Sequence, residues 1–219
     1  MRRISTLTLA LAVALGALLL HGCAQVQKAA TQIAAVPVPA AMPIPAAPGN
    51  LLVNGSFEVP VVRDGAYVLV NTGQSFAGWQ VIGAAGAVAP ISGKYGRAGI
   101  TFTAQHGNQW LDMTGLSNTA TGIQQAVRTE PGVQYELSFH VGNVVGGGFG
   151  TTSAVEVLVD GRSLGVFRND GHSPRQQHWR QASVTVTATA TTTVIAFINR
   201  DGASDDSNGL DNVSFRRLR

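Results

Sequence analysis

Apolar and polar residues alternate along the second half of the chain with a period of two, as in a half-buried β-strand. Val133, Tyr135, Leu137, Phe139 and Val141 would share one face of a strand, and the four residues between them are polar. No window carries the apolar stripe of a long helix. The pattern therefore predicts an all-β domain.

Shorter segments repeat this signal. Residues 154–167 predict two strands joined at Asp160-Gly161, a dipeptide that favours tight hairpins. About ten short strands with turn residues between them are typical of a β-sandwich. The predicted strands are the opening NLLVNGSFEVP (50–60), 66–70, 78–83, 99–103, 109–114, 122–128, the pair within 182–199 and the closing GLDNVSF (209–215).

Composition and charge narrow the class of protein. Charged residues make up only 12% of the chain and glycine occurs 26 times, which suits a β-domain with many turns. The formal net charge is +3, and the 15 basic residues less Arg2 and Arg3 leave 13 against 12 acidic ones. That balance does not favour nucleic-acid binding, so no nucleic-acid partner is expected.

The first 22 residues have the three parts of an export signal: basic Arg2 and Arg3, an apolar run, and a small residue before Cys23. Leu20-His21-Gly22-Cys23 resembles the lipobox of bacterial lipoproteins. The resemblance implies that Cys23 carries acyl chains such as palmitate and anchors the protein to a membrane. Ala24 resembles the pattern sorted to the outer membrane. The alternative is an ordinary secretory signal with a chance cysteine.

Residues 23–49 form an Ala/Pro-rich linker with five prolines. Proline fixes φ and removes a backbone donor, so this spacing excludes a helix or a central strand. We expect an extended spacer between the anchor and a single domain at 50–219. Cys23 is the only cysteine, so this domain contains no disulfide.

Several blocks follow one another in a recognisable order: NLLVNGSFE, GWQV, GNQWLDMTG, GIQQAVRTEPGVQYELSFHVGN and NGLDNVSF. Together they resemble the DUF642 family and its bacterial relatives with galactose-binding-like domains. The resemblance implies a jelly-roll β-sandwich that works as a carbohydrate-binding or cell-surface module. Plant members carry cysteines in the domain and usually two tandem domains, whereas the single domain expected at 50–219 has no cysteine, so their functions do not transfer intact.

In many such modules a calcium ion joins the first and last strands. The resemblance places Glu58 and Asp211 at this position and implies a structural calcium site. Calcium takes six to eight oxygens, so backbone carbonyls would have to complete the two carboxylates. The alternative is that Glu58 points to solvent at a bulge or pairs with an arginine.

A ligand site is expected near aromatic and loop residues. Trp110 would either stack on a sugar ring or cap the core. Asn143 and Phe149 belong to the Gly-rich stretch GNVVGGGFGTTS, which would form either a binding loop or a flexible connection.

No H-E-x-x-H or P-loop motif is present, and the letters G-x-S-x-G occur at residues 161–165 inside the predicted hairpin and not at a strand-to-helix turn, so we expect no enzyme. The sequence therefore predicts an envelope lipoprotein whose jelly-roll domain binds a glycan without catalysis. One alternative is a structural or adhesive protein that binds a protein partner. A glycan hydrolase is the other, because a carboxylate pair that meets only in space leaves no motif.

Lipidation gives the first testable prediction. Cys23→Ser should abolish labelling of the protein with a palmitate analogue and leave the precursor uncleaved at this site, because serine lacks the thiol that receives the lipid. A variant that still incorporates the label would show that Cys23 is not the anchor.

Overall fold

The computed structural model describes residues 49–115, 118–202 and 207–219. They belong to one compact unit that spans residues 41–219. The predicted signal peptide at 1–22, Cys23 and the linker as far as residue 48 lie outside the described residues. Within the described ranges, no helix is long and apolar enough to cross a membrane.

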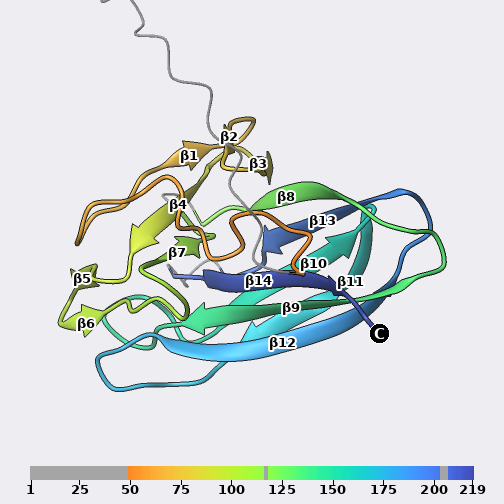
Figure 1. The fold of residues 1–219 in the computed structure, drawn as a ribbon. Helices are drawn as coiled ribbons and strands as arrows, with labels where there is room; N and C mark the ends of the chain where they lie inside the picture. Colours follow the sequence, from red (N-terminus) through yellow and green to blue (C-terminus); the bar gives the residue numbers. More distant parts are fainter. Residues whose placement is uncertain (1–48, 116–117, 203–206) are drawn as a thin grey trace, which may run out of the picture. The chain divides into compact units, whose positions relative to one another are not determined.

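Two six-stranded antiparallel sheets face each other (Figure 1). Sheet 1 has the order β1 (Val70–Asn71), β4 (Ala87–Ser92), β7 (Gln109–Asp112), β14 (Gly209–Arg217), β9 (Gln134–Asn143), β12 (His178–Thr187). Sheet 2 has the order β11 (Arg162–Asn169), β10 (Ser153–Val159), β13 (Thr192–Asn199), β8 (Thr121–Arg128), β3 (Trp79–Gly83), β2 (Ser75–Phe76). A separate hairpin pairs β5 (Gly96–Arg97) with β6 (Ile100–Thr101).

The core between the sheets contains the apolar residues that the alternation predicts. Tyr135, Leu137, Phe139 and Val141 of β9 are at most 3% exposed, and the residues between them are more exposed. Aromatic rings cross the core in edge contacts, with Phe139 5.2 Å from Phe197 between ring centroids. The all-β jelly-roll sandwich that the sequence predicts is confirmed.

Local predictions are confirmed where turn chemistry is explicit. Asp160 and Gly161 both have positive φ and join β10 to β11, as their sequence predicts. The prediction of a first strand at 50–60 is wrong, because Asn54 and Phe57 also take positive φ and break the extended backbone.

Residues 50–60 nevertheless run beside β14, as the resemblance implied. The N–H of Leu51 donates to the carbonyl of Phe215, and the N–H of Val213 donates to the carbonyl of Gly55. The buried side chain of Asn50 strengthens this contact. Its amide donates to the Val213 carbonyl, and its oxygen accepts the N–H groups of Leu52 and Phe215.

Sheet 1 carries a second apolar layer on the face turned away from the core. Residues 93–108, which we call the covering segment, contribute Ile100 and Phe102 to a buried cluster there. Ala89 and Ile91 of β4 and Trp110 of β7 form the floor of this cluster. All residues of β4 and β7 are buried, so these two strands have covered faces on both sides. This local third layer holds the candidate site.

Asn50 gives a stability prediction. Asn50→Ala should lower the free energy of unfolding by about 3 kcal/mol, because it leaves the buried Val213 carbonyl and Phe215 N–H without a partner. Urea unfolding curves of residues 49–219 measure the change. Asn71→Ala, at an exposed position of the edge strand β1, is the matched control and should change stability by less than about 0.5 kcal/mol. Equal curves for the two variants would contradict the role of Asn50.

Candidate functional site

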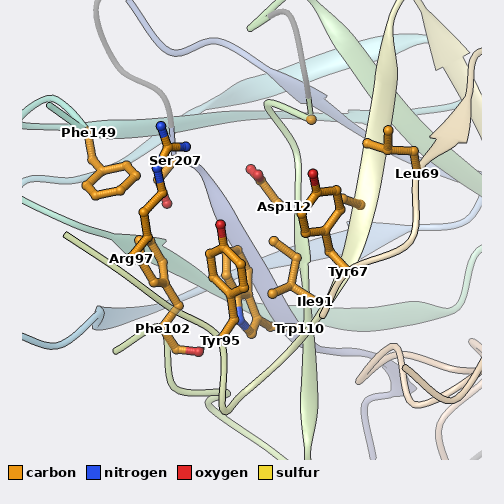
Figure 2. Close-up of a pocket in the computed structure, with 12 residues that line it drawn as sticks. Tyr67, Leu69, Ile91, Tyr95, Arg97, Phe102, Trp110, Asp112, Phe149 and Ser207 are labelled. Atoms are coloured by element: carbon orange, nitrogen blue, oxygen red, sulfur yellow. Dashed lines mark hydrogen bonds between the residues drawn. The ribbon is translucent and has the colours of Figure 1, made fainter. Parts of the chain in front are cut away.

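A pocket of about 100 Å³ opens between the covering segment and sheet 1. Its lining includes the rings of Tyr67, Tyr95, Phe102, Trp110 and Phe149 (Figure 2). Arg97 and Asp112 are the only charged residues in the lining. An apolar pocket with few convergent polar groups is the usual form of a small-molecule site.

Strand register places Asp112 in this pocket. Successive side chains of a strand point to opposite faces, and Leu111 of β7 lies in the core between the sheets. Trp110 and Asp112 therefore point to the outer face of sheet 1. Figure 2 shows the carboxylate of Asp112 among the side chains that line the pocket.

The environment of Asp112 favours its neutral form. One carboxylate oxygen accepts the Thr114 N–H at 3.0 Å and the Thr114 hydroxyl at 2.7 Å, and both bonds favour the ionised form. Burial nevertheless raises the pKa of Asp112 from 3.8 to about 6, because loss of water outweighs these bonds. Asp112 can therefore hold or release a proton near neutral pH.

The aromatic walls support one another. Phe102 stacks on Trp110 with ring centroids 6.1 Å apart and an angle of 9° between the planes. Phe149 meets the edge of Phe102 at 5.1 Å, and Tyr95 lies 5.5 Å from Phe102. Contacts between these rings fix the shape of the pocket before any ligand binds.

The predicted ligand residues Trp110 and Phe149 both line this pocket, although neither is an exposed platform. Trp110 is 1% exposed, and its indole N–H donates to the Phe102 carbonyl at 3.1 Å. It belongs to the floor of the buried cluster on the outer face of sheet 1 and is not a surface platform for a sugar. Phe149 is 6% exposed and closes one side of the pocket from the Gly-rich loop.

Asn143 is absent from the pocket lining. Its side chain is 1% exposed and donates to the carbonyls of Thr151 and Gly171, while its oxygen accepts the Ser153 hydroxyl. These bonds tie together the two ends of the loop that carries Phe149. Asn143 thus helps to position the loop that carries Phe149 and does not contact the pocket itself.

Sequence reasoning missed Asp112. The signal was present in GNQWLDM, where the core position of Leu111 places Trp110 and Asp112 on the opposite face. What the sequence could not give was the burial of Asp112, because burial depends on contacts between distant segments.

Glu58 and Asp211 lie on either side of residues 105–109. One oxygen of Glu58 accepts the N–H groups of Asn108 and Gln109, each at 2.9 Å. Asp211 accepts the N–H groups of Gln105 and His106 at 2.8 and 2.9 Å. A Cβ at Gly107 would collide with the Glu58 carboxylate, so glycine permits this close approach.

The two carboxylates lie close enough for their charges to interact. Burial raises the pKa of Asp211 to about 7, and the nearby charge of Glu58 adds to that shift. Three of the four carboxylate oxygens already accept backbone N–H groups, counting the bond from Asn212 to Asp211. Among the described residues, no group of three His, Cys, Asp or Glu side chains forms a metal site. Calcium held by Glu58, Asp211 and backbone carbonyls therefore stays a prediction.

Comparison with known proteins gives a family. The family model described as HpiC1-like, HpiC1 cyclase, matches residues 50–215. The matching model is thus not the DUF642 one that the order of motifs resembles. No curated protein matches the chain.

Solved structures similar to this chain include sugar-binding domains. A family 35 carbohydrate-binding module from Clostridium thermocellum is 15% identical with a TM-score of 0.42, over 68% of this chain and 97% of the module. TmCBM61, solved with β-1,4-galactotriose, is 15% identical with a TM-score of 0.42. The similarity covers 77% of this chain and 99% of TmCBM61. The EclA C-terminal domain, a sugar-binding protein, is 11% identical with a TM-score of 0.36, over 42% of this chain and 64% of that one.

The calcium prediction can be tested by melting. Calcium should raise the melting temperature of metal-free protein and a chelator should reverse the effect, because the ion binds only the folded state. A hundredfold excess over Kd corresponds to about 2.7 kcal/mol. Glu58→Gln and Asp211→Asn should each remove most of the rise in melting temperature that calcium causes. The double variant should lose no more of this rise than either single variant, because both residues act through one ion. If calcium does not change the melting temperature of metal-free wild type, the prediction of a calcium site is wrong.

The pH dependence gives a second test of Asp211. Its pKa is raised in the folded protein, so the folded state binds this proton more tightly than the unfolded chain. In metal-free protein this contribution is fully present below about pH 4 and is lost as the pH rises through about 7. The stability of the wild type relative to Asp211→Asn should fall over that interval. A constant difference between the two unfolding curves would contradict the shift.

Proposed function

The chain belongs to the HpiC1-like family, and on that premise we propose that it is a cyclase that closes a ring in a small, largely apolar substrate. The observation that carries the proposal is Asp112, a carboxyl group with a pKa of about 6 in an aromatic pocket. The non-catalytic module expected from the absence of motifs stays as the rival prediction.

The proposed reaction uses Asp112 first as an acid and then as a base. Its carboxyl proton passes to a carbon–carbon double bond of the substrate, and a second double bond of the same molecule attacks the cationic carbon. The new carbon–carbon bond closes the ring, and a ring proton returns to the Asp112 carboxylate. Atoms and charge balance, so substrate and product are isomers and no co-reactant is needed.

The pocket walls suit such a step. A carbocation is attracted to the faces of aromatic rings, and Tyr95, Phe102 and Trp110 all line the pocket. Burial of Trp110 and Phe149 limits water, which would otherwise trap the cation as an alcohol. Hydrogen bonds from Thr114 hold the carboxyl group of Asp112 in one orientation.

Glycan binding is the second candidate, and the exposed ring of Tyr67 favours it. Tyr67 is 46% exposed and meets the edge of Tyr95 at 6.0 Å. A sugar ring could stack on it without entering the pocket. A glycan array with wild type and Tyr67→Ala tests this candidate, since loss of a specific signal in the variant would support it.

We also propose that the protein works in the bacterial cell envelope, anchored at the outer membrane through Cys23. The lipobox supports this location. The Ala/Pro-rich linker would hold the catalytic domain away from the bilayer.

If the protein is a cyclase, Asp112→Asn should abolish the conversion of the substrate to its cyclic isomer. Incubation of wild type with a small-molecule extract of the producing cells should deplete one compound and yield another of equal mass but different retention in liquid chromatography. The rate should fall about tenfold per pH unit above about pH 6, because only neutral Asp112 donates the proton. Asparagine keeps the shape and the acceptor oxygen, so the variant should fold.

Asp170→Asn is the matched control, since Asp170 is an exposed partner of Arg180 outside the pocket lining. It should convert the substrate at the wild-type rate. Conversion by Asp112→Asn at that rate, or no isobaric product from wild type between about pH 5 and 7, would contradict the cyclase.

A further inference from the structure

We propose that the substrate of this site carries a carboxylate group on its compact apolar body, and that this group is bound by Arg97, which is exposed, and by the buried Ser207. The inference deepens the proposed function and rests on it. It concerns the class of substrate that the pocket selects, which neither the family description nor the fold specifies.

Arg97 is presented to the pocket by a tight hairpin. Ala98 and Gly99 both take positive φ and join β5 to β6, as a two-residue turn requires. Two backbone hydrogen bonds hold the hairpin to residues 175–177. The Thr101 N–H donates to the Arg175 carbonyl, and the Thr101 carbonyl accepts the Gln177 N–H. Figure 2 shows the Arg97 side chain on the same side of the pocket as Phe149.

The guanidinium group of Arg97 keeps its donors available. Its central carbon lies 5.6 Å from the Phe149 ring centroid, so the flat cation is held over an aromatic face. The N–H groups of a guanidinium point outward in its own plane, where they match the two oxygens of a carboxylate. Among the described residues Arg97 makes no ion pair, unlike Lys94, Arg180, Arg200 and Arg217.

Ser207 gives an independent indication of a polar ligand. It is 3% exposed and lines the same pocket, and its hydroxyl has no hydrogen-bond partner among the described residues. A buried hydroxyl without a partner costs free energy that a bound oxygen atom would recover. A carboxylate held by Arg97 would bring such an oxygen to the side of the pocket that Ser207 lines.

The remaining lining limits the body of the ligand. Apart from Arg97, Asp112 and Ser207, the pocket residues are aromatic, aliphatic or glycine. A cavity of about 150 Å³ holds a benzene ring, so the 100 Å³ here suits about one ring with a head group left at the mouth. The cation at the rim selects a negative head group.

The experiment compares phenylacetate with phenylacetamide, which have nearly the same shape and differ in charge. Binding to residues 49–219 of the wild type is measured by calorimetry at about pH 5.5, where neutral Asp112 predominates. Phenylacetate should bind about fivefold more tightly, a modest factor because Arg97 is exposed to solvent. The preference should shrink as salt is added.

Variants assign the preference to the two residues. Arg97→Gln should remove the fivefold preference and leave phenylacetamide binding unchanged, whereas Arg97→Lys should keep part of it. Ser207→Ala should weaken phenylacetate binding about twofold to threefold. Arg128→Gln, at an exposed position of β8 in the other sheet, is the matched control and should behave as wild type.

The outcomes separate this inference from the proposed function. Equal binding of the two probes, or a preference that survives Arg97→Gln, would overturn the carboxylate inference and leave an apolar pocket for a neutral substrate. Failure of both probes to bind, together with no isobaric conversion by the wild type, would overturn both proposals.

Discussion

The candidate site depends on the burial of sheet 1 from both sides. In a two-layer sandwich the outer face of a sheet normally meets water, and its strands alternate apolar and polar residues. Here β4 and β7 are buried throughout, because residues 93–108 cover their outer face. The pocket lies between this covering segment and sheet 1. Phe102 of the segment and Trp110 and Asp112 of β7 all line it. Asp112 lies in the wall of this pocket, where its carboxylate accepts hydrogen bonds from Thr114 and from the Asn208 N–H.

Burial sets the chemistry of Asp112 by removing water from its carboxyl group. Two hydrogen bonds from Thr114 favour the ionised carboxylate of Asp112, yet its pKa still rises from 3.8 to about 6. A shift of this size corresponds to about 3 kcal/mol against the charged form, which is a large fraction of the stability of a typical domain. Strongly shifted pKa values gather at functional sites, and structural carboxylates such as Asp211 carry them as well.

Asp211 shows the contrast with a structural role. It is also buried and its pKa is also raised, but it accepts N–H groups from the covering segment and from Asn212. Together with Glu58 it fixes residues 105–109, where the covering segment returns to β7. The pair predicted to hold calcium therefore positions the cover over the pocket, with or without an ion. Loss of either carboxylate would disturb the site from a distance.

Sequence patterns predict this fold well because each strand needs only local information. The alternation from Tyr135 to Val141 and the Asp160-Gly161 turn are confirmed, since period and turn chemistry are read from neighbouring residues. Residues 50–60 fail because Asn50 and Asn54 bond to the backbone through their side chains, and this competes with a strand. Trp110 and Phe149 could be nominated as ligand residues by type, whereas Arg97, Asp112 and Ser207 come together only through contacts between distant segments.

The covering segment also bears on the choice between glycan binding and catalysis. An extended glycan needs an open platform of exposed rings, and the rings of Phe102, Trp110 and Phe149 are turned toward one another instead. Burying them gives up a platform and leaves a small open pocket with a proton donor in its wall. A carboxyl group that titrates near neutral pH suits an acid catalyst. The buried rings and Asp112 in the pocket wall are therefore the observations that support the proposed catalysis.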